Sequence, residues 1–276
     1  TILTRAGGAD KSMGRAMSTD ELVSKAKSIG IEQNIDPAEV MKGFDAVKKL
    51  TGNVEKAVEI MPGIAKLATA TGGNLGEMSG LAANIMAANP NISNEEMQQQ
   101  MRVFTRQGAV GGVEVADFAK YGSRLTAGAT LFGGDKSKNQ ATMGALAQIS
   151  RQYGGAATPA EAALAAQRFA TDVAKHSETL KKQGIDVSDK HGNLRDAQSI
   201  LADMIDKTGG DVTKLGKMGL GERGVKALTG VSAIYKNAGG GQAGRDAVKA
   251  EFSKYTEGVT EQEVERANAR VLGESG

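Results

Sequence analysis

Glycine constrains the fold most, because 37 glycines divide the 276-residue chain into short segments. Within these segments apolar residues recur at helical spacing, as at Phe169, Val173 and Leu180. A glycine directly after such a segment ends a helix, since it readily adopts the left-handed backbone conformation of a helix C-terminus. The predicted helix ends are Gly30, Gly52, Gly72, Gly73, Gly154, Gly155, Gly184, Gly209 and Gly210. We therefore expect an all-α protein, a globular bundle of many short helices.

Helix starts are marked by capping boxes, in which a hydroxyl and a carboxylate three residues later satisfy otherwise unpaired backbone amides. Four pairs match this pattern: Ser18 with Glu21, Ser93 with Glu96, Thr158 with Glu161, and Thr260 with Glu263. A further helix is expected to begin at Pro37 after Asp36. Pro62 should break or kink the helix that starts after Asn53.

Residues 180–204 predict a polar turn between two amphipathic helices. Gly184 ends the first helix, and the sequence from Asp189 to Gly192 has Asp first and Gly fourth, as in a type I turn. The apolar positions on either side of the turn are Ile185, Val187 and Leu194. We expect one small β-hairpin near residues 185–194.

Composition predicts a soluble domain without naming an activity. Lys and Arg number 34 against 32 for Asp and Glu, so the net charge of +2 provides no basic field for nucleic acid. The absence of cysteine excludes a disulfide scaffold and cysteine-based zinc sites. No apolar run reaches the length of about 18 residues that a membrane span requires. Met97, Met101 and Phe104 share one helix face, which predicts core packing.

The chain is expected to be organised in four parts. Residues 1–17 form a mobile N-terminal segment, as polar termini usually do. Residues 18–133 form an N-terminal helical half, and residues 140–236 form a C-terminal helical half that contains the hairpin. Residues 242–276 form further helices that could lead into a longer rod.

Two glycine patterns fit the dinucleotide motif GxGxxG, at residues 219–224 and 239–244. Neither follows a strand-like run, and a phosphate-binding turn needs that context. We therefore expect no cofactor. Gly221 and Gly224 have a structural explanation instead, because they let the start of a helix pass close to a neighbour. The glycines at 239–241 are expected to be a flexible connector.

Candidate metal and catalytic residues have structural explanations as well. The polar cluster at residues 186–193 contains Asp189 and His191 but lacks the ligand spacing of an EF-hand. With His176 as the only other histidine, no zinc site is expected. The carboxylates considered as general acids are Glu77, Glu161 and Glu178. Each stands where a helix surface or cap calls for a carboxylate, so we expect no catalytic residue and no enzyme.

Several segments, taken in order, resemble the core domain of phage tail tape measure proteins over about residues 18–231. They include PGIAKLATATGGNLGEMSGLAANIM at 62–86, ADFAKYGSRL at 116–125, TMGALAQISRQYGG at 142–155, the turn at 180–204 and GERGVKAL at 221–228. The specificity lies in their order, because each piece alone is a small-residue helix with a glycine end. The long coiled-coil portion of such proteins is missing, so this chain is expected to be a core fragment.

The resemblance implies a structural protein of the virion tail, at its lumen or tip, that is present in the host cytoplasm during assembly. Such proteins set tail length, organise virion assembly and leave the tube at DNA ejection. The implied partners are tail tube, tail-tip and tail assembly chaperone proteins, other copies in the tail, and the host envelope at ejection, with no specific nucleic acid.

Two alternatives come from other classes of protein. The first is a lytic, peptidoglycan-degrading module carried by the tail. The second is a helical secreted effector or pore former, although the sequence lacks a strongly amphipathic, cation-rich helix.

Overall fold

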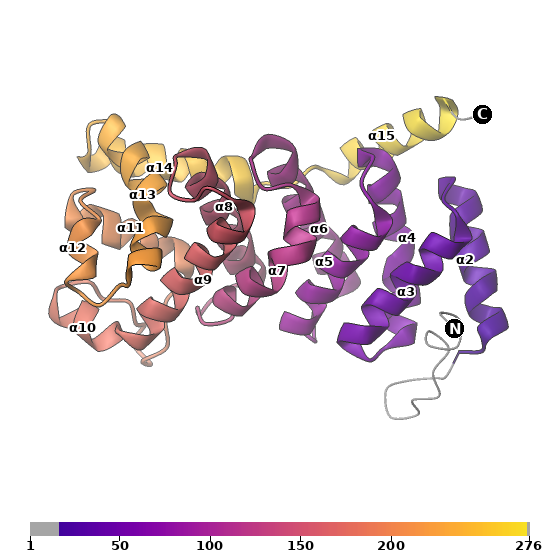
Figure 1. Cartoon of the computed structure of the whole chain (residues 1–276), viewed down its shortest axis with the longest axis horizontal. Coiled ribbons are helices and arrows are strands. Elements are labelled where there is room, and N and C mark those ends of the chain that lie inside the picture. Colours follow the sequence, from indigo (N-terminus) through magenta and orange to yellow (C-terminus); the bar gives the residue numbers. More distant parts are fainter. Residues whose placement is uncertain (1–16, 275–276) are drawn as a thin grey trace. The chain divides into compact units, whose positions relative to one another are not determined.

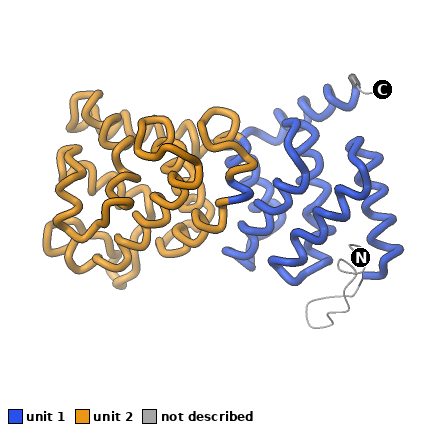
Figure 2. Tube along the Cα trace, viewed as in Figure 1, with its two compact units in different colours: residues 1–105, 118–120, 258–276 blue, residues 106–117, 121–257 orange. Residues whose placement is uncertain are grey.

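The computed structural model describes residues 17–274, which contain fourteen helices and no β-strand (Figure 1). The predicted all-α class is confirmed. Contacts divide the chain into two compact units (Figure 2). The predicted mobile N-terminal segment lies, apart from Met17, outside the described residues. The predicted domain ranges 18–133, 140–236 and 242–276 stay predictions.

Unit 1 contains the described residues up to Thr105, residues 118–120 and the residues from Gly258 onward. Its complete helices are α2 (Thr19–Gln33), α3 (Pro37–Thr51), α4 (Val54–Thr71), α5 (Leu75–Ala88) and α15 (Glu261–Glu274). The first part of α6 (Asn94–Val110) completes the unit. α3 packs against α2, α4 and α5, and α15 packs against α4 although the two are far apart in sequence.

Unit 2 contains residues 106–117 and 121–257. Most of α7 (Val115–Ala129) belongs to it. Its complete helices are α8 (Lys136–Gln152), α9 (Pro159–Lys175), α10 (Ser177–Lys182), α11 (Ala197–Thr208), α12 (Thr213–Gly216), α13 (Glu222–Asn237) and α14 (Gly241–Thr256). α13 packs against α8, α9 and α14, and α14 also packs against α8. α13 is therefore central to this unit.

Local sequence signals set most helix starts. The Ser18–Glu21 capping box is confirmed, with Oε2 of Glu21 2.8 Å from the amide nitrogen of Ser18. The other predicted pairs bonded in both directions are Ser93 with Glu96 and Thr260 with Glu263. α3 begins at Pro37 as predicted, and Oδ1 of Asp36 accepts from the amide of Ala38.

The predicted helix end at Gly30 is wrong, and the break predicted as one possibility at Pro62 does not occur, while a kink there stays a prediction. α2 continues through Gly30 to Gln33 and ends at Asn34, whose φ of 53° supplies the left-handed conformation. Gly30 is instead a point of close approach, because a Cβ there would lie 2.6 Å from the carbonyl oxygen of Ile35. α4 likewise runs through Pro62 without ending.

The predicted β-hairpin near residues 185–194 is also wrong. The segment makes one isolated antiparallel bridge, between Ser188 and Leu194, and forms no strand. Oδ1 of Asp189 accepts from the amides of His191 and Asn193, so the Asn193 amide that would extend the ladder is bonded to a side chain. Oδ1 of Asp186 accepts from the amide of Ser188. Such local bonds compete with sheet formation.

The core consists of aliphatic, methionine and phenylalanine side chains. Met97, Met101 and Phe104 are buried, as predicted, and the ring of Phe104 lies 5.0 Å from that of Phe118. In unit 2 Phe169 is fully buried beside Phe132. Among the described helices, none has both the length and the apolar character needed to cross a membrane.

Candidate interaction groove

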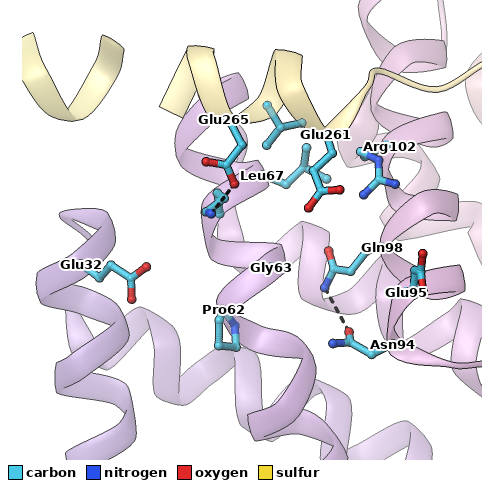
Figure 3. Close-up of a pocket in the computed structure, with 12 residues that line it drawn as sticks. Glu32, Pro62, Gly63, Leu67, Asn94, Glu95, Gln98, Arg102, Glu261 and Glu265 are labelled. Atoms are coloured by element: carbon cyan, nitrogen blue, oxygen red, sulfur yellow. Dashed lines mark hydrogen bonds and ion pairs between the residues drawn. The ribbon is translucent and has the colours of Figure 1, made fainter. Parts of the chain in front are cut away.

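A groove of about 410 Å³ opens on the surface of unit 1 (Figure 3). It is lined by Glu32 of α2, four residues of α4, four of α6 and three of α15. α15 supplies Glu261, Val264 and Glu265 to the lining, and Figure 3 shows Glu261 and Glu265 on the α15 side of the groove. We call this cavity the α4 groove. It brings together the N-terminal helices and the C-terminal helix of the same unit.

A glycine and a glutamine allow α6 to approach α4 beside this groove. Nε2 of Gln98 donates to the carbonyl oxygen of Ile60 at 3.1 Å. This bond lies close to Pro62, which has no backbone N–H to donate within α4. A Cβ on Gly63 would lie 2.3 Å from Nε2 of Gln98. Gly63 therefore leaves the space that the Gln98 amide fills.

α15 is anchored to unit 1 by a buried amide contact. Nδ2 of Asn268 donates to Oε1 of Gln33 at 2.7 Å, and the same nitrogen lies 3.4 Å from the carbonyl oxygen of Lys66. Asn268 is 6% exposed and Gln33 is 3% exposed. A buried amide needs a correctly placed partner, so this contact fixes the register of α15 on α2 and α4.

The α4 groove carries more negative than positive charge. Its carboxylates are Glu32, Glu95, Glu261 and Glu265, and its cations are Lys66 and Arg102. Nζ of Lys66 pairs with Glu265 at 2.7 Å, and the two side chains are 33% and 56% exposed. Such an exposed pair contributes little stability. The groove can therefore offer charge contacts and amide hydrogen bonds to a protein segment.

A second groove, of about 420 Å³, lies within unit 2 between α11, α13, α14 and the start of α8. Its floor includes the buried side chains Ile205, Val248 and Phe252. Arg245 at its rim is bonded to Asp206. This groove is suited to an apolar side chain surrounded by polar contacts.

The turn predicted around Asp189 is built from side-chain and backbone hydrogen bonds. Gly184 and Gly192 have φ values of 82° and 84°, and the amide of Gly192 donates to the carbonyl oxygen of Asp189 at 3.1 Å. The carboxylate of Asp189 accepts from the amides of His191 and Asn193, and the bond from His191 does most to lower the pKa of Asp189. The cluster is a turn at the surface.

Gly221 and Gly224 stand at the start of α13, next to Asp172 of α9. The amide of Gly221 donates to Oδ2 of Asp172 at 2.9 Å, and a Cβ on Gly224 would lie 2.6 Å from that oxygen. A carboxylate thus occupies the helix N-terminus that a phosphate would need. No sequence pattern points to Asp172, because its partner Gly221 lies 49 residues away.

Glycines 239–241 make a tight connection between α13 and α14, with φ values of 96°, 69° and 55°. The ring of Tyr235 explains the next glycine of the pattern, because a Cβ on Gly244 would lie 2.6 Å from its Cδ2 atom. The hydroxyl of Tyr235 accepts from the amide of Gly241 at 3.0 Å. The second GxGxxG pattern is therefore explained by helix packing.

The three carboxylates considered as general acids lie apart from both grooves. Glu77, Glu161 and Glu178 are exposed, and each is in the first turn of a different helix. Thr158 caps α9 by accepting from the amide of Glu161, whose own carboxylate accepts from Ala157. The Glu161 carboxylate therefore bonds to the amide of Ala157 and not to that of Thr158, as the predicted capping box would have it. Within residues 17–274 no group of three acidic or histidine side chains could hold a metal ion.

Comparison with known proteins gives one family. The family model described as phage-related minor tail protein matches residues 23–244. No curated protein and no solved structure matches the chain. The match covers most of both units' helices and stops shortly after α14 begins.

Proposed function

We propose that this chain, which belongs to the family of phage-related minor tail proteins, is the folded core of a tail tape measure protein. As a member of that family it has a structural role in a phage tail and associates with other tail components. The finer assignment adds that it helps set tail length, organises tail assembly and leaves the tube at DNA ejection. The observation that carries the proposal is the single family match, which runs through the segments that resemble tape measure cores.

Helix dimensions indicate which part of such a protein this chain would be. A ruler measures length if its extent is proportional to residue number, and a continuous helix provides this at about 1.5 Å per residue. The longest described helix, α4, has 18 residues, which corresponds to about 27 Å. Short, packed helices cannot measure a tail. We therefore assign this chain to a folded module of the tape measure protein, and assign length measurement to a separate rod.

The two grooves give the proposed module its contact surfaces. The α4 groove has an excess of carboxylates, and the unit 2 groove has an apolar floor. Such surfaces suit contact with tail tube, tail-tip or tail assembly chaperone proteins. We further propose that several copies stand together in the tail lumen or tip, and that the module contacts the host envelope at ejection.

An in-frame deletion of residues 18–231 from the phage or prophage tests the proposal. We expect no tails, or tails that do not infect, because a folded organising module would be lost while any rod remained. The readouts are tail length by electron microscopy and plaque formation. Tails of unchanged length and full infectivity would contradict the assignment.

Release at ejection has its own test. Immunoblots should detect the chain in intact particles and not in tails that have ejected their DNA. Retention of the chain in emptied tails would contradict release while leaving the assembly role intact.

We propose that the role is not enzymatic, because the candidate carboxylates serve as helix caps or surface residues. Incubation of the purified protein with peptidoglycan should release no soluble fragments. Release that is lost in Glu161→Gln or Glu178→Gln would instead identify a lytic module.

A further inference from the structure

Helix α15 is attached to the rest of unit 1 through few buried groups. Among its side chains at positions 261–273, only Val264 and Asn268 are buried, and its main packing partner is α4. An isolated helix of this length is marginally stable in water. The position of α15 is therefore decided by its docking contacts.

Two of those contacts are directional. The amide of Asn268 bonds to Gln33 at 2.7 Å, and Glu265 pairs with Lys66 at 2.7 Å. The amide contact fixes the position of α15 along α4, and the buried side chains of Val264 and Asn268 fix which side of α15 faces α4. The docking site thus recognises a helix with an apolar residue, an acidic residue and an amide at the spacing of Val264, Glu265 and Asn268.

The connection to α15 allows the helix to change its partner. Residues 257–260, between α14 and α15, are not helical. The backbone of Glu257 is already extended, with φ −84° and ψ 126°. Rotation about a few such residues is enough to redirect α15, as in other hinges.

We propose that the docking site on α2 and α4 also binds α15 of a second copy of this chain, so that two copies exchange this helix. Every contact that α15 makes within its own chain is available from an identical helix, and the exchanged form restores the same hydrogen bonds and the same charge pair. Exchange of an identical element is a low-cost route to a dimer. The Val264 surface and the Gln33 amide are buried in either form.

The Lys66–Glu265 pair allows a direct test on the unmodified protein. Equal amounts of ¹⁵N-labelled and unlabelled chain are mixed at increasing concentration and treated with a carbodiimide, which joins an amine to a carboxylate in contact. Peptides containing the Lys66–Glu265 link are then weighed by mass spectrometry. Mixed-isotope links should increase with concentration, toward about half of all such links in a fully exchanged mixture.

The Lys226–Glu222 pair is the matched control, because its 3.1 Å contact lies within a single helix. At every concentration the Lys226–Glu222 links should join two labelled or two unlabelled residues, and never one of each. Glu265→Gln should remove the Lys66 link and verify its assignment. If the Lys66–Glu265 links form but remain in one isotope at all concentrations, α15 does not exchange and the proposal is overturned. Because the test uses purified protein, its failure would leave the proposed tail function unaffected.

Discussion

The centre of unit 2 and the α15 edge of unit 1 are held by different kinds of contact. In unit 2, α13 lies so close to α8 that a Cβ on Gly230 would be 2.8 Å from the carbonyl oxygen of Ile149. In unit 1, α15 is held through Val264, an amide bond and an exposed charge pair. Dense packing must be lost as a whole, whereas a sparse contact can open locally. The comparison predicts that the centre of unit 2 opens only with global unfolding, and that the α15 edge of unit 1 opens first.

The largest expected effect is in the unit 2 core. Phe169 is fully buried, and its ring lies 6.1 Å from that of Phe132. Phe169→Ala should lower the free energy of unfolding by about 3–5 kcal/mol, since it removes a large side chain and leaves a cavity. Denaturant titration followed by circular dichroism measures the loss. The control Arg168→Ala, at the exposed neighbouring position, should change the free energy of unfolding little. If Phe169→Ala lowered it by no more than this control, the core would repack freely around the missing ring.

A buried glutamine holds the loop after α6 in unit 2. The side chain of Gln148 accepts from the amide of Val113 and donates to the carbonyl oxygens of Val113 and Gln107, at 2.6–2.9 Å. Gln148→Leu should cost about 2–3 kcal/mol of unfolding free energy, because it leaves buried backbone groups unpaired. The exposed Gln99→Leu is the control in the same denaturant titration. Equal stability of the two variants would mean that water replaces the glutamine.

The α15 edge should respond locally and by less. Asn268→Leu removes the donor to Gln33, so α15 should open more readily, by about 1–2 kcal/mol. Hydrogen exchange should quicken over residues 261–274 and stay unchanged in α13. The double variant Gln33→Leu/Asn268→Leu should recover much of the protection, because both polar groups are then gone. Faster exchange throughout the chain would erase the contrast between the two regions.

The range of each interaction decides what could be predicted from sequence. The caps at Ser18 and Thr260 were predicted because each box is made by residues three apart. The contact between Asn268 and Gln33 was not, because it joins residues 235 positions apart. Gly30 is a different case, because Asn34 and not Gly30 adopts the left-handed conformation that ends α2. Around Asp189 the sequence predicts a hairpin, whereas the structure has one isolated bridge, because the Asp189 carboxylate accepts from the amides of His191 and Asn193.

The smallest expected effect is at the Asp189 turn, which lies at the surface and belongs to neither of the two regions compared above. The amide of His191 lowers the pKa of the Asp189 carboxyl below its ordinary value of 3.8. A carboxyl with a depressed pKa in the folded state stabilises the fold above its unfolded pKa, and this contribution is lost as the pH falls through the folded pKa. Asp189→Asn should therefore be less stable than the natural chain at neutral pH, and the difference should shrink as the pH falls through the lowered folded-state pKa of Asp189. Thermal unfolding at a series of pH values measures this difference. Asp186→Asn, on the same surface, is the comparison variant. A pH-independent difference for Asp189→Asn would mean that the turn depends on side-chain shape and not on charge.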